Sequence, residues 1–349
     1  QGQGHCQPCP ASFFFPTGFI TARITRTALH LTCSQILTAQ RVRLRATLGG
    51  VNARLRYSLS HDRKSMSHIT NPEGAAPASS SNPPLFNARR VRVQHIARAK
   101  AEGIPLTMLT AYDALTAPIL EAAGVDMLLI GDSLGNVILG HGSTLPVTLE
   151  DMERATAAVA RSTSRAMIVA DLPFGTYEDT PEHAFASAAR LMKAGAHAVK
   201  LEGGEARAHI IAALTAAGIP VCAHLGYTPQ SENTLGGPRM QGRGDSAEQL
   251  RRDSLAVQEA GAFAVVFEMV PASIATELTQ TLSIATIGIG AGPSDGQVLV
   301  IDDMLGKNKS FSPKFLRRYA DLHTIMTDAI GRFVTDVKTA DFPSESEQY

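Results

Sequence analysis

Short apolar runs alternate with helix-period stretches along this chain from about residue 86 onward. Several of the apolar runs, such as Met127–Ile130 and Ala264–Phe267, are continuous rather than alternating, which is typical of strands covered on both faces. We therefore predict eight β-strands: Leu106–Asp113, Met127–Ser133, Ala166–Pro173, Ala198–Gly203, Pro220–Gly226, Phe263–Val270, Ala285–Gly292 and Gln297–Ile301.

Alanine-rich amphipathic stretches lie between the predicted strands, with apolar residues near positions i, i+3, i+4 and i+7. This spacing predicts helices over Leu149–Ser162, Pro181–Ala194, Ala206–Ala217 and Asp245–Ala260. Glycine commonly follows the last turn of a helix, and four glycines occupy such positions: Gly124, Gly195, Gly218 and Gly261. The chain from Pro313 onward is expected to form further helix with a polar end.

Strands that alternate with helices predict βα units and a parallel sheet. Eight such units close most economically into a (β/α)8 TIM barrel, which we expect over residues 86–349 as the catalytic domain. Local patterns do not show whether the sheet closes, so an open doubly wound sheet is the alternative.

Residues 1–85 differ from the rest, because they contain nine Lys or Arg against only Asp62 and Glu73. A segment rich in Arg, Ser and Thr with little acid resembles an organellar presequence, so we expect a largely disordered N-terminal extension and a mitochondrial location. The alternatives are a plain disordered tail and a cytoplasmic protein. Cys6 and Cys9 form a C-x-x-C pair, but no second pair follows at zinc-finger spacing, which favours coincidence. Four cysteines, three of them in this segment, predict no disulfide framework.

Composition narrows the class of function. A content of 44% hydrophobic and 18% charged residues is ordinary for a soluble globular protein. From residue 86 onward 23 basic residues face 30 acidic ones, which argues against nucleic-acid binding, because such surfaces need excess positive charge. No apolar run reaches the length of a membrane span, ~18 residues. The slight excess of acidic residues favours an enzyme that acts on small molecules.

Five predicted strands end in a polar residue that an apolar strand should not carry: Asp132, Asp171, Glu202, His224 and Glu268. In a barrel of parallel strands, every carboxyl-terminal strand end opens on the same mouth. We therefore expect these side chains to meet in one pocket.

Asp132 and Asp171 emerge from apolar strands with no sequence neighbour to neutralise them. Burying such charges unpaired is costly, and a hard divalent cation removes the cost. With Glu202 at a third strand end, the pattern predicts a metal site of Asp132, Asp171 and Glu202. The alternative is that each Asp caps the turn after its strand.

Lys200 lies two residues before Glu202, so both side chains share one face of their strand. Lys200 could form a structural ion pair or hold a substrate carboxylate or oxyanion. His224 could be a core histidine bonded to backbone or an active-site group. Glu268, flanked by apolar residues, could act as a general base or form a salt bridge across the barrel.

An ordered set of motifs runs along residues 86–335. It comprises Thr110–Asp113, Gly131–Gly135, Gly140–Thr148, Ala170–Phe174, Val199–Gly204, Ala223–Gln230, Gln241–Arg243, Phe267–Pro271, Ile287–Gly292 and Asp295–Gln297. No single motif is decisive, but the ordered set is specific, and it resembles that of the ketopantoate hydroxymethyltransferase family.

This resemblance implies a barrel of the phosphoenolpyruvate/pyruvate superfamily that assembles into a large homo-oligomer, a decamer. It also implies bound Mg²⁺, 5,10-methylenetetrahydrofolate as co-substrate, and a 2-oxoacid, 3-methyl-2-oxobutanoate, as acceptor in the first step of pantothenate synthesis.

By the same resemblance, Asp132, Asp171 and Glu202 hold the metal. Asp132, Ser133, Asp171 and Lys200 contact the ketoacid. The proton acceptor corresponds to Glu268, with His224 and Lys200 as further catalytic groups.

Two other functions remain open from the sequence. One is a Mg²⁺-dependent lyase or phosphonomutase-like enzyme of the same superfamily, although such enzymes use a cysteine-bearing loop that has no clear counterpart here. The other is a non-catalytic barrel that binds a partner, against which the full set of strand-end carboxylates argues.

Overall fold

A computed structural model describes residues 87–349 of the chain. Contacts divide the chain after Glu73, and all described residues belong to the unit Gly74–Tyr349. The predicted extension 1–85, with its expected disorder and its cysteines, lies outside the described residues.

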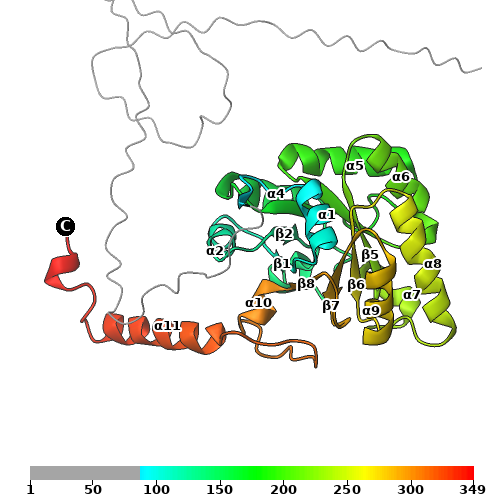
Figure 1. The fold of residues 1–349 in the computed structure, drawn as a ribbon. Helices are drawn as coiled ribbons and strands as arrows, with labels where there is room; N and C mark the ends of the chain where they lie inside the picture. Colours follow the sequence, from blue (N-terminus) through cyan, green and yellow to red (C-terminus); the bar gives the residue numbers. More distant parts are fainter. Residues whose placement is uncertain (1–86) are drawn as a thin grey trace, which may run out of the picture. The chain divides into compact units, whose positions relative to one another are not determined.

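Eight parallel strands form a closed barrel in the order β1 to β8 (Figure 1). Strand β1 pairs with β2 on one side and with β8 on the other, so the open-sheet alternative is wrong. Each observed strand lies within or next to a predicted one, usually with shorter ends. The strands are β1 Leu106–Thr110, β2 Met127–Ile130, β3 Met167–Asp171, β4 Ala198–Glu202, β5 Val221–Gly226, β6 Ala264–Glu268, β7 Ala285–Ile289 and β8 Gly296–Leu299.

Helices connect successive strands, except β7 and β8, which a loop joins, and they lie outside the ring of strands (Figure 1). The longer ones are α1 Val93–Glu102, α4 Leu149–Ser162, α5 Pro181–Ala194, α6 Ala208–Ala216, α8 Asp245–Glu259, α9 Ala272–Thr281 and α11 Leu322–Lys338. The shorter ones are α2 Thr116–Ala122, α3 Leu134–Val137, α7 Glu232–Leu235 and α10 Ile301–Met304, with 3₁₀ turns η2 Glu205–Arg207, η3 Pro229–Ser231 and η4 Glu345–Glu347.

The helix bounds follow from local chemistry. Helix α4 begins as predicted, because the Thr148 side chain accepts a hydrogen bond from the Asp151 backbone N–H. Helix α5 also has its predicted bounds and ends at Gly195, whose φ of 117° suits a residue without a side chain. The final helix, α11, begins at Leu322, later than Pro313.

The apolar core has two layers separated by the sheet. Outward-facing strand residues pack against the helices, whereas inward-facing residues fill the barrel. Ile96 and Ala99 of α1 belong to the inner cluster together with Leu106 and Met108, so α1 closes the amino-terminal end of the barrel. The opposite end is thereby left for a ligand, as in other barrels of this type.

On a strand, every second residue faces the inside of the barrel, and these residues form an inward row. Polar residues at the mouth are the last members of such rows. On β4, the period of two carries the inward row from Ala198 through Lys200 to Glu202; on β5, it leads from Cys222 to His224. Register sets neighbours side by side, because Glu202 is opposite His224. Within residues 87–349, no helix is both long enough and apolar enough to cross a membrane.

Candidate active site

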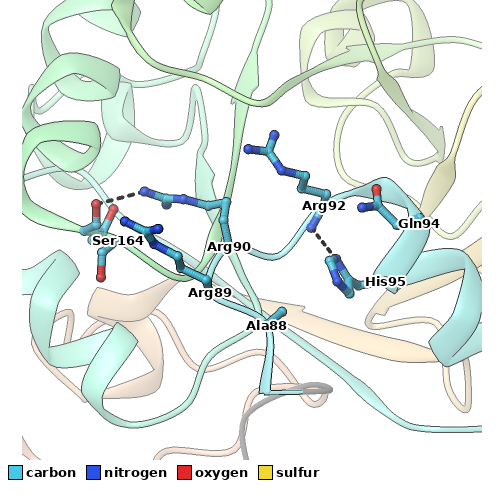
Figure 2. Close-up of a pocket in the computed structure, with 8 residues that line it drawn as sticks. Ala88, Arg89, Arg90, Arg92, Gln94, His95 and Ser164 are labelled. Atoms are coloured by element: carbon cyan, nitrogen blue, oxygen red, sulfur yellow. Dashed lines mark hydrogen bonds between the residues drawn. The ribbon is translucent and has the colours of Figure 1, made fainter.

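Two cavities differ in the chemistry of their walls. One, about 690 Å³, is bordered by Arg89, Arg90 and Arg92 (Figure 2). Arg90 there donates to the backbone oxygens of Ala166 and Thr163 at 2.8 and 3.1 Å. Among residues 87–349, no carboxylate lines this cavity, so this part of the chain offers no oxygen-rich cation site there.

The second cavity, about 450 Å³, lies at the barrel mouth, where the predicted polar strand ends meet. The predicted site residues all line it: Asp132, Ser133, Asp171, Lys200, Glu202, His224 and Glu268. Apolar side chains cover another part of its wall, among them Val298, Phe311, Phe315 and Leu316. A polar cluster facing apolar wall is the arrangement expected of a small-molecule site.

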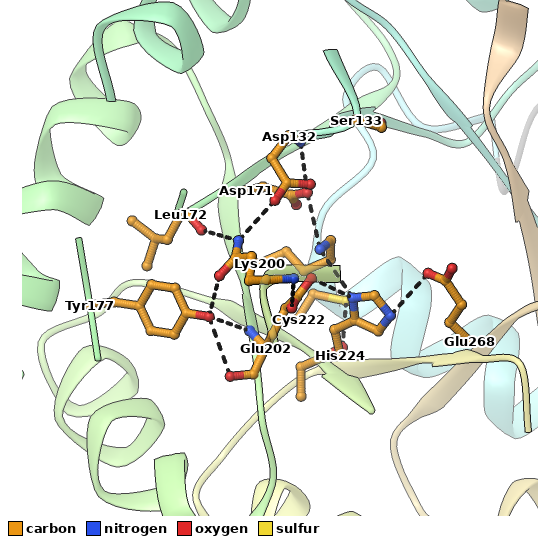
Figure 3. Close-up of polar contacts among 12 residues, drawn as sticks. Asp132, Ser133, Asp171, Leu172, Tyr177, Lys200, Glu202, Cys222, His224 and Glu268 are labelled. Atoms are coloured by element: carbon orange, nitrogen blue, oxygen red, sulfur yellow. Dashed lines mark hydrogen bonds and ion pairs between the residues drawn. The ribbon is translucent and has the colours of Figure 1, made fainter. Parts of the chain in front are cut away.

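Asp171 lies at the centre of the polar cluster (Figure 3). Its Oδ2 accepts a hydrogen bond from the Asp132 backbone N–H at 3.1 Å and pairs with Lys200 Nζ at 3.0 Å. Its Oδ1 is buried and has no hydrogen-bond partner. A buried carboxylate oxygen without a partner is costly, so this atom is suited to bind a ligand.

Burial sets the protonation of these groups. It raises the pKa of Asp171 to about 6, although the Lys200 ammonium opposes the shift. Burial likewise raises the pKa of Asp132, again against the effect of Lys200. Burial alone would lower the pKa of Lys200, but Asp171, Asp132 and Glu202 outweigh it and hold the pKa above its ordinary value. Lys200 is therefore a permanent cation among carboxylates.

The donor chemistry of the Asp132 and Asp171 pair fits a hard divalent cation. Mg²⁺ typically takes one or two carboxylates and completes its shell with water and substrate oxygens. Within residues 87–349, no three His, Cys, Asp or Glu side chains are grouped so as to hold a metal ion by themselves. Glu202 instead accepts from the Gln230 backbone N–H at 2.9 Å through Oε2. The three-carboxylate ligand set stays a prediction.

His224 lies between two acidic side chains (Figure 3). Its Nδ1 is 3.4 Å from Glu202 Oε1 and 3.4 Å from Lys200 Nζ, and its Nε2 is 3.3 Å from Glu268 Oε2. The two distances to carboxylates are ion-pair separations, and the one at Nε2 is too long for a well-formed hydrogen bond. Burial and the Lys200 charge both lower the pKa of His224, but Glu202 and Glu268 outweigh them and raise it to about 9. Its partners are side chains rather than backbone.

Ser133 and Cys222 occupy contrasting positions. Ser133 Oγ lies 2.9 Å from the Tyr112 hydroxyl at the cavity wall. Cys222, the free cysteine of the described residues, is buried beneath Lys200 and His224 in the inward rows. Burial raises the pKa of its thiol to about 12, so it is no nucleophile.

Sequence reasoning missed two residues of the site, Gln230 and Tyr177. Both are buried, and their side chains hydrogen-bond to each other and to the groups around Asp132 and Glu202. Gln230 falls in a motif that follows His224, which was a usable signal. Tyr177 lies in the β3–α5 connection, where the sequence carries no pattern that would mark it.

Comparisons with known proteins point to one family. A family model described as ketopantoate hydroxymethyltransferase matches residues 90–345. The 3-methyl-2-oxobutanoate hydroxymethyltransferase of Mycobacterium ulcerans (strain Agy99) is 53% identical over 273 residues, covering 77% of this chain and 92% of the relative. The enzyme of the same name from Corynebacterium efficiens is 52% identical over 266 residues, covering 76% and 99%.

Among solved structures, a phosphonopyruvate hydrolase complex with oxalate and Mg²⁺ is similar, with a TM-score of 0.48 and 16% identity. The match covers 73% of this chain and 92% of that one. Since the family model spans most of residues 87–349 and the relatives align over nearly their whole length, the chain belongs to the ketopantoate hydroxymethyltransferase family.

Proposed function

We propose that the protein transfers a hydroxymethyl group from 5,10-methylenetetrahydrofolate to 3-methyl-2-oxobutanoate, giving 2-dehydropantoate. The observation that carries the proposal is that Asp132, Asp171, Lys200 and Glu268 line a single cavity at the barrel mouth. A 2-oxoacid needs positive charge for its carboxylate and a base near its C3 carbon, and this cavity has both. The names of the relatives support the same activity.

In this proposal Glu268 accepts the C3 proton of the ketoacid. Its side chain is 19% exposed, so substrate can reach it from the cavity. His224 Nε2, 3.3 Å away, fixes the position of the carboxylate and can pass a proton on. The C3 carbon then bonds to the methylene carbon of the folate as one of its two C–N bonds breaks. Water displaces the second folate nitrogen, so that a C–O bond replaces the remaining C–N bond. The proton from C3 and one proton from the water go to the two nitrogens, and tetrahydrofolate leaves.

Lys200 supplies fixed positive charge for the ketoacid and for the negative charge that develops when its proton leaves. Its partner Asp171 holds the ammonium in place at 3.0 Å. Ser133, with its hydroxyl at the wall of the same cavity, offers a hydrogen bond to the ketoacid.

Asp132 and Asp171 would hold a divalent cation, which we propose to be Mg²⁺, with Glu202 as the third member of the predicted set. Such a cation, when bound, withdraws electron density from a keto group and makes the neighbouring C–H more acidic. The unpartnered Oδ1 of Asp171 supports this assignment.

Two assays test the proposal. Purified protein should form 2-dehydropantoate from the two substrates, and a chelator should abolish turnover until Mg²⁺ is restored. Glu268→Gln should slow exchange of the ketoacid C3 proton with solvent deuterium by ~100-fold or more, as expected for loss of a general base. Exchange at the wild-type rate would show that another group is the base, and no turnover by the wild type would refute the activity itself.

We further propose a homo-oligomer. Helix α11 has no buried residue, and apolar side chains form a stripe along it at heptad-like spacing: Met326, Ile330, Phe333 and Val337. A second copy of the chain would cover such a stripe. The decameric size implied by the sequence resemblance stays a prediction.

A mitochondrial location is likewise proposed, on the composition of residues 1–85 alone. Fusing this segment to a fluorescent protein should direct the fusion to mitochondria. A diffuse cytoplasmic signal would contradict the proposal.

A further inference from the structure

We infer that Gln230, oriented by Tyr177, is a positioning residue that holds Asp132 and Glu202 in place for the cation. The inference rests on the proposed function, because that function assigns these carboxylates to the cation. The proposed chemistry uses neither residue, and the sequence analysis names Gln230 only as the last residue of a motif.

Gln230 lies in the connection after β5 and contacts the ends of three other strands. Its Nε2 donates to Asp132 Oδ2 at 2.9 Å and to the Leu172 backbone oxygen at 3.0 Å. Its backbone N–H donates to Glu202 Oε2 at 2.9 Å. One residue therefore fixes the relative positions of two carboxylates that arise from different strands.

Tyr177 determines which way the Gln230 amide faces. The Tyr177 hydroxyl donates to Gln230 Oε1 at 2.6 Å. It accepts from the Glu202 backbone N–H at 3.1 Å (Figure 3). A reversed amide would place its carbonyl oxygen against two acceptors, Asp132 Oδ2 and the Leu172 oxygen. Because Gln230 and Tyr177 are both buried, water does not relieve such a conflict.

The two aspartates are thus held by different means. A cation, Lys200, pairs with Asp171, whereas a neutral amide holds Asp132. An amide orients a carboxylate without neutralising it, so the charge of Asp132 stays available for a metal ion. Lysine or arginine in place of Gln230 would compete with that ion.

The test compares Mn²⁺ binding, in the absence of both substrates, among folded variants of the full chain. Mn²⁺ is a paramagnetic probe that prefers the same oxygen ligands as Mg²⁺, and free Mn²⁺ is measured by electron paramagnetic resonance. Tyr177→Phe removes only the hydroxyl, and Gln230→Leu removes the amide. Each should weaken Mn²⁺ binding ~10- to 100-fold, the range for partners that orient metal ligands.

Gln258→Leu is the matched control. The Gln258 side chain accepts hydrogen bonds from Ser283 at the outer surface of the barrel, so its loss should leave Mn²⁺ affinity unchanged. Kinetics add a second readout. With Mn²⁺ or Mg²⁺ saturating, kcat should recover in Tyr177→Phe more than in Asp132→Asn, because the ligands themselves are intact. If Gln230→Leu does not fold, Tyr177→Phe alone decides.

Mn²⁺ affinities within two-fold of the wild type in folded Tyr177→Phe would overturn the inference. Wild-type protein that binds no Mn²⁺ would overturn it together with the proposed cation site. Wild-type protein that binds Mn²⁺, loses affinity in the variants, and does not convert the ketoacid would support the inference and contradict the proposed reaction alone.

Discussion

Charge at the barrel mouth is unbalanced in the protein without ligands. Lys200 is the one lysine in the cavity wall, and three buried carboxylates surround it: Asp132, Asp171 and Glu202. Burial therefore opposes ionisation of both aspartates, whose pKa values are raised. A site of this kind lowers the stability of the metal-free protein and raises its affinity for a cation.

Asp132→Asn tests whether the Asp132 charge lowers the stability of the metal-free protein and contributes to cation binding. The substitution keeps the shape and the acceptor for Gln230 but removes one charge, so the metal-free protein should become more stable at pH 8, by roughly 1–3 kcal/mol. Mg²⁺ at about 100 times its Kd should stabilise the wild type by ~2.7 kcal/mol and leave the variant unaffected. Urea unfolding with EDTA or with Mg²⁺ measures both quantities. Equal stabilisation of the variant by Mg²⁺ would remove Asp132 from the ligand set.

His224 gives the empty protein a pH dependence of stability. Its pKa is raised to about 9 in the folded state, above the ordinary value of 6.5. The imidazolium therefore stabilises the fold fully below pH 6.5, and this contribution is lost as the pH rises through about 9. In metal-free protein, the unfolding free energy of the wild type should fall more steeply than that of His224→Asn over this window. Parallel curves for the two proteins would contradict the assignment.

At the scale of elements, strand periodicity explains why the polar groups converge. Inward rows that begin with core residues end in Asp171, Glu202, His224 and Glu268, so each strand carries both barrel core and site. A backbone hydrogen bond between the ends of β5 and β6 sets the final position of Glu268. The Tyr227 N–H donates to the Glu268 backbone oxygen at 2.8 Å.

Because Gly226 has no side chain, the end of β5 can lie this close to the Glu268 backbone. Its replacement should displace Glu268, the proposed base. It has a φ of 94°, and a Cβ there would lie 2.2 Å from the Glu268 backbone oxygen. Gly226→Ala should therefore lower kcat at least ~10-fold, because displacing a catalytic group by about 1 Å is that costly. Gly218→Ala is the matched control: its φ is 85°, but nothing lies within 4 Å of the added carbon. The control should lose about 1 kcal/mol of stability and keep its activity; equal activity of both variants would show that the β5 end does not position Glu268.

Elements were more predictable from sequence than the connections between them. Helices α4 and α5 have their predicted bounds, because Thr148 and Gly195 mark their ends locally. The strands were predicted too long, since residues such as Asp113 and Ser133 extend past the last ladder hydrogen bonds. The contact between Tyr177 and Gln230 depends on how distant connections meet above the closed barrel; Gln230 lies in a recognisable motif, but no local pattern marks Tyr177.

At the scale of the whole molecule, the predicted (β/α)8 barrel is confirmed, although local patterns indicated only the repeated βα units and closure was inferred as their most economical arrangement. Closure follows from the pairing of β1 with β8, which joins the ends of the repeat. The described chain then continues into α11, whose apolar side chains contrast with its polar opposite face. Phe333 is 54% exposed and Ile330 57% exposed, which is unusual for neighbouring apolar groups on one helix.

Oligomer disruption tests the role of this stripe. The double variant Ile330→Glu, Phe333→Glu places two charges on the stripe and should shift the mass measured by light scattering toward the 37.0 kDa of one chain. Thr335→Glu, which adds one such charge on the opposite face of α11, should leave the assembly unchanged. A wild type that is already a single chain in solution would contradict the homo-oligomer.

The pairing of Leu106 with Gly296 has a consequence for how the protein is made. The ribosome releases β1 well before β8. Until β8 emerges, one edge of β1 has no partner strand, and the outer edge of the newest strand is also unpaired. Unpaired strand edges pair with other chains, and pairing between segments far apart in the sequence is slow. Nascent chains of this protein are therefore most prone to aggregate before residues 296–299 emerge, and chaperone demand should fall sharply once they do.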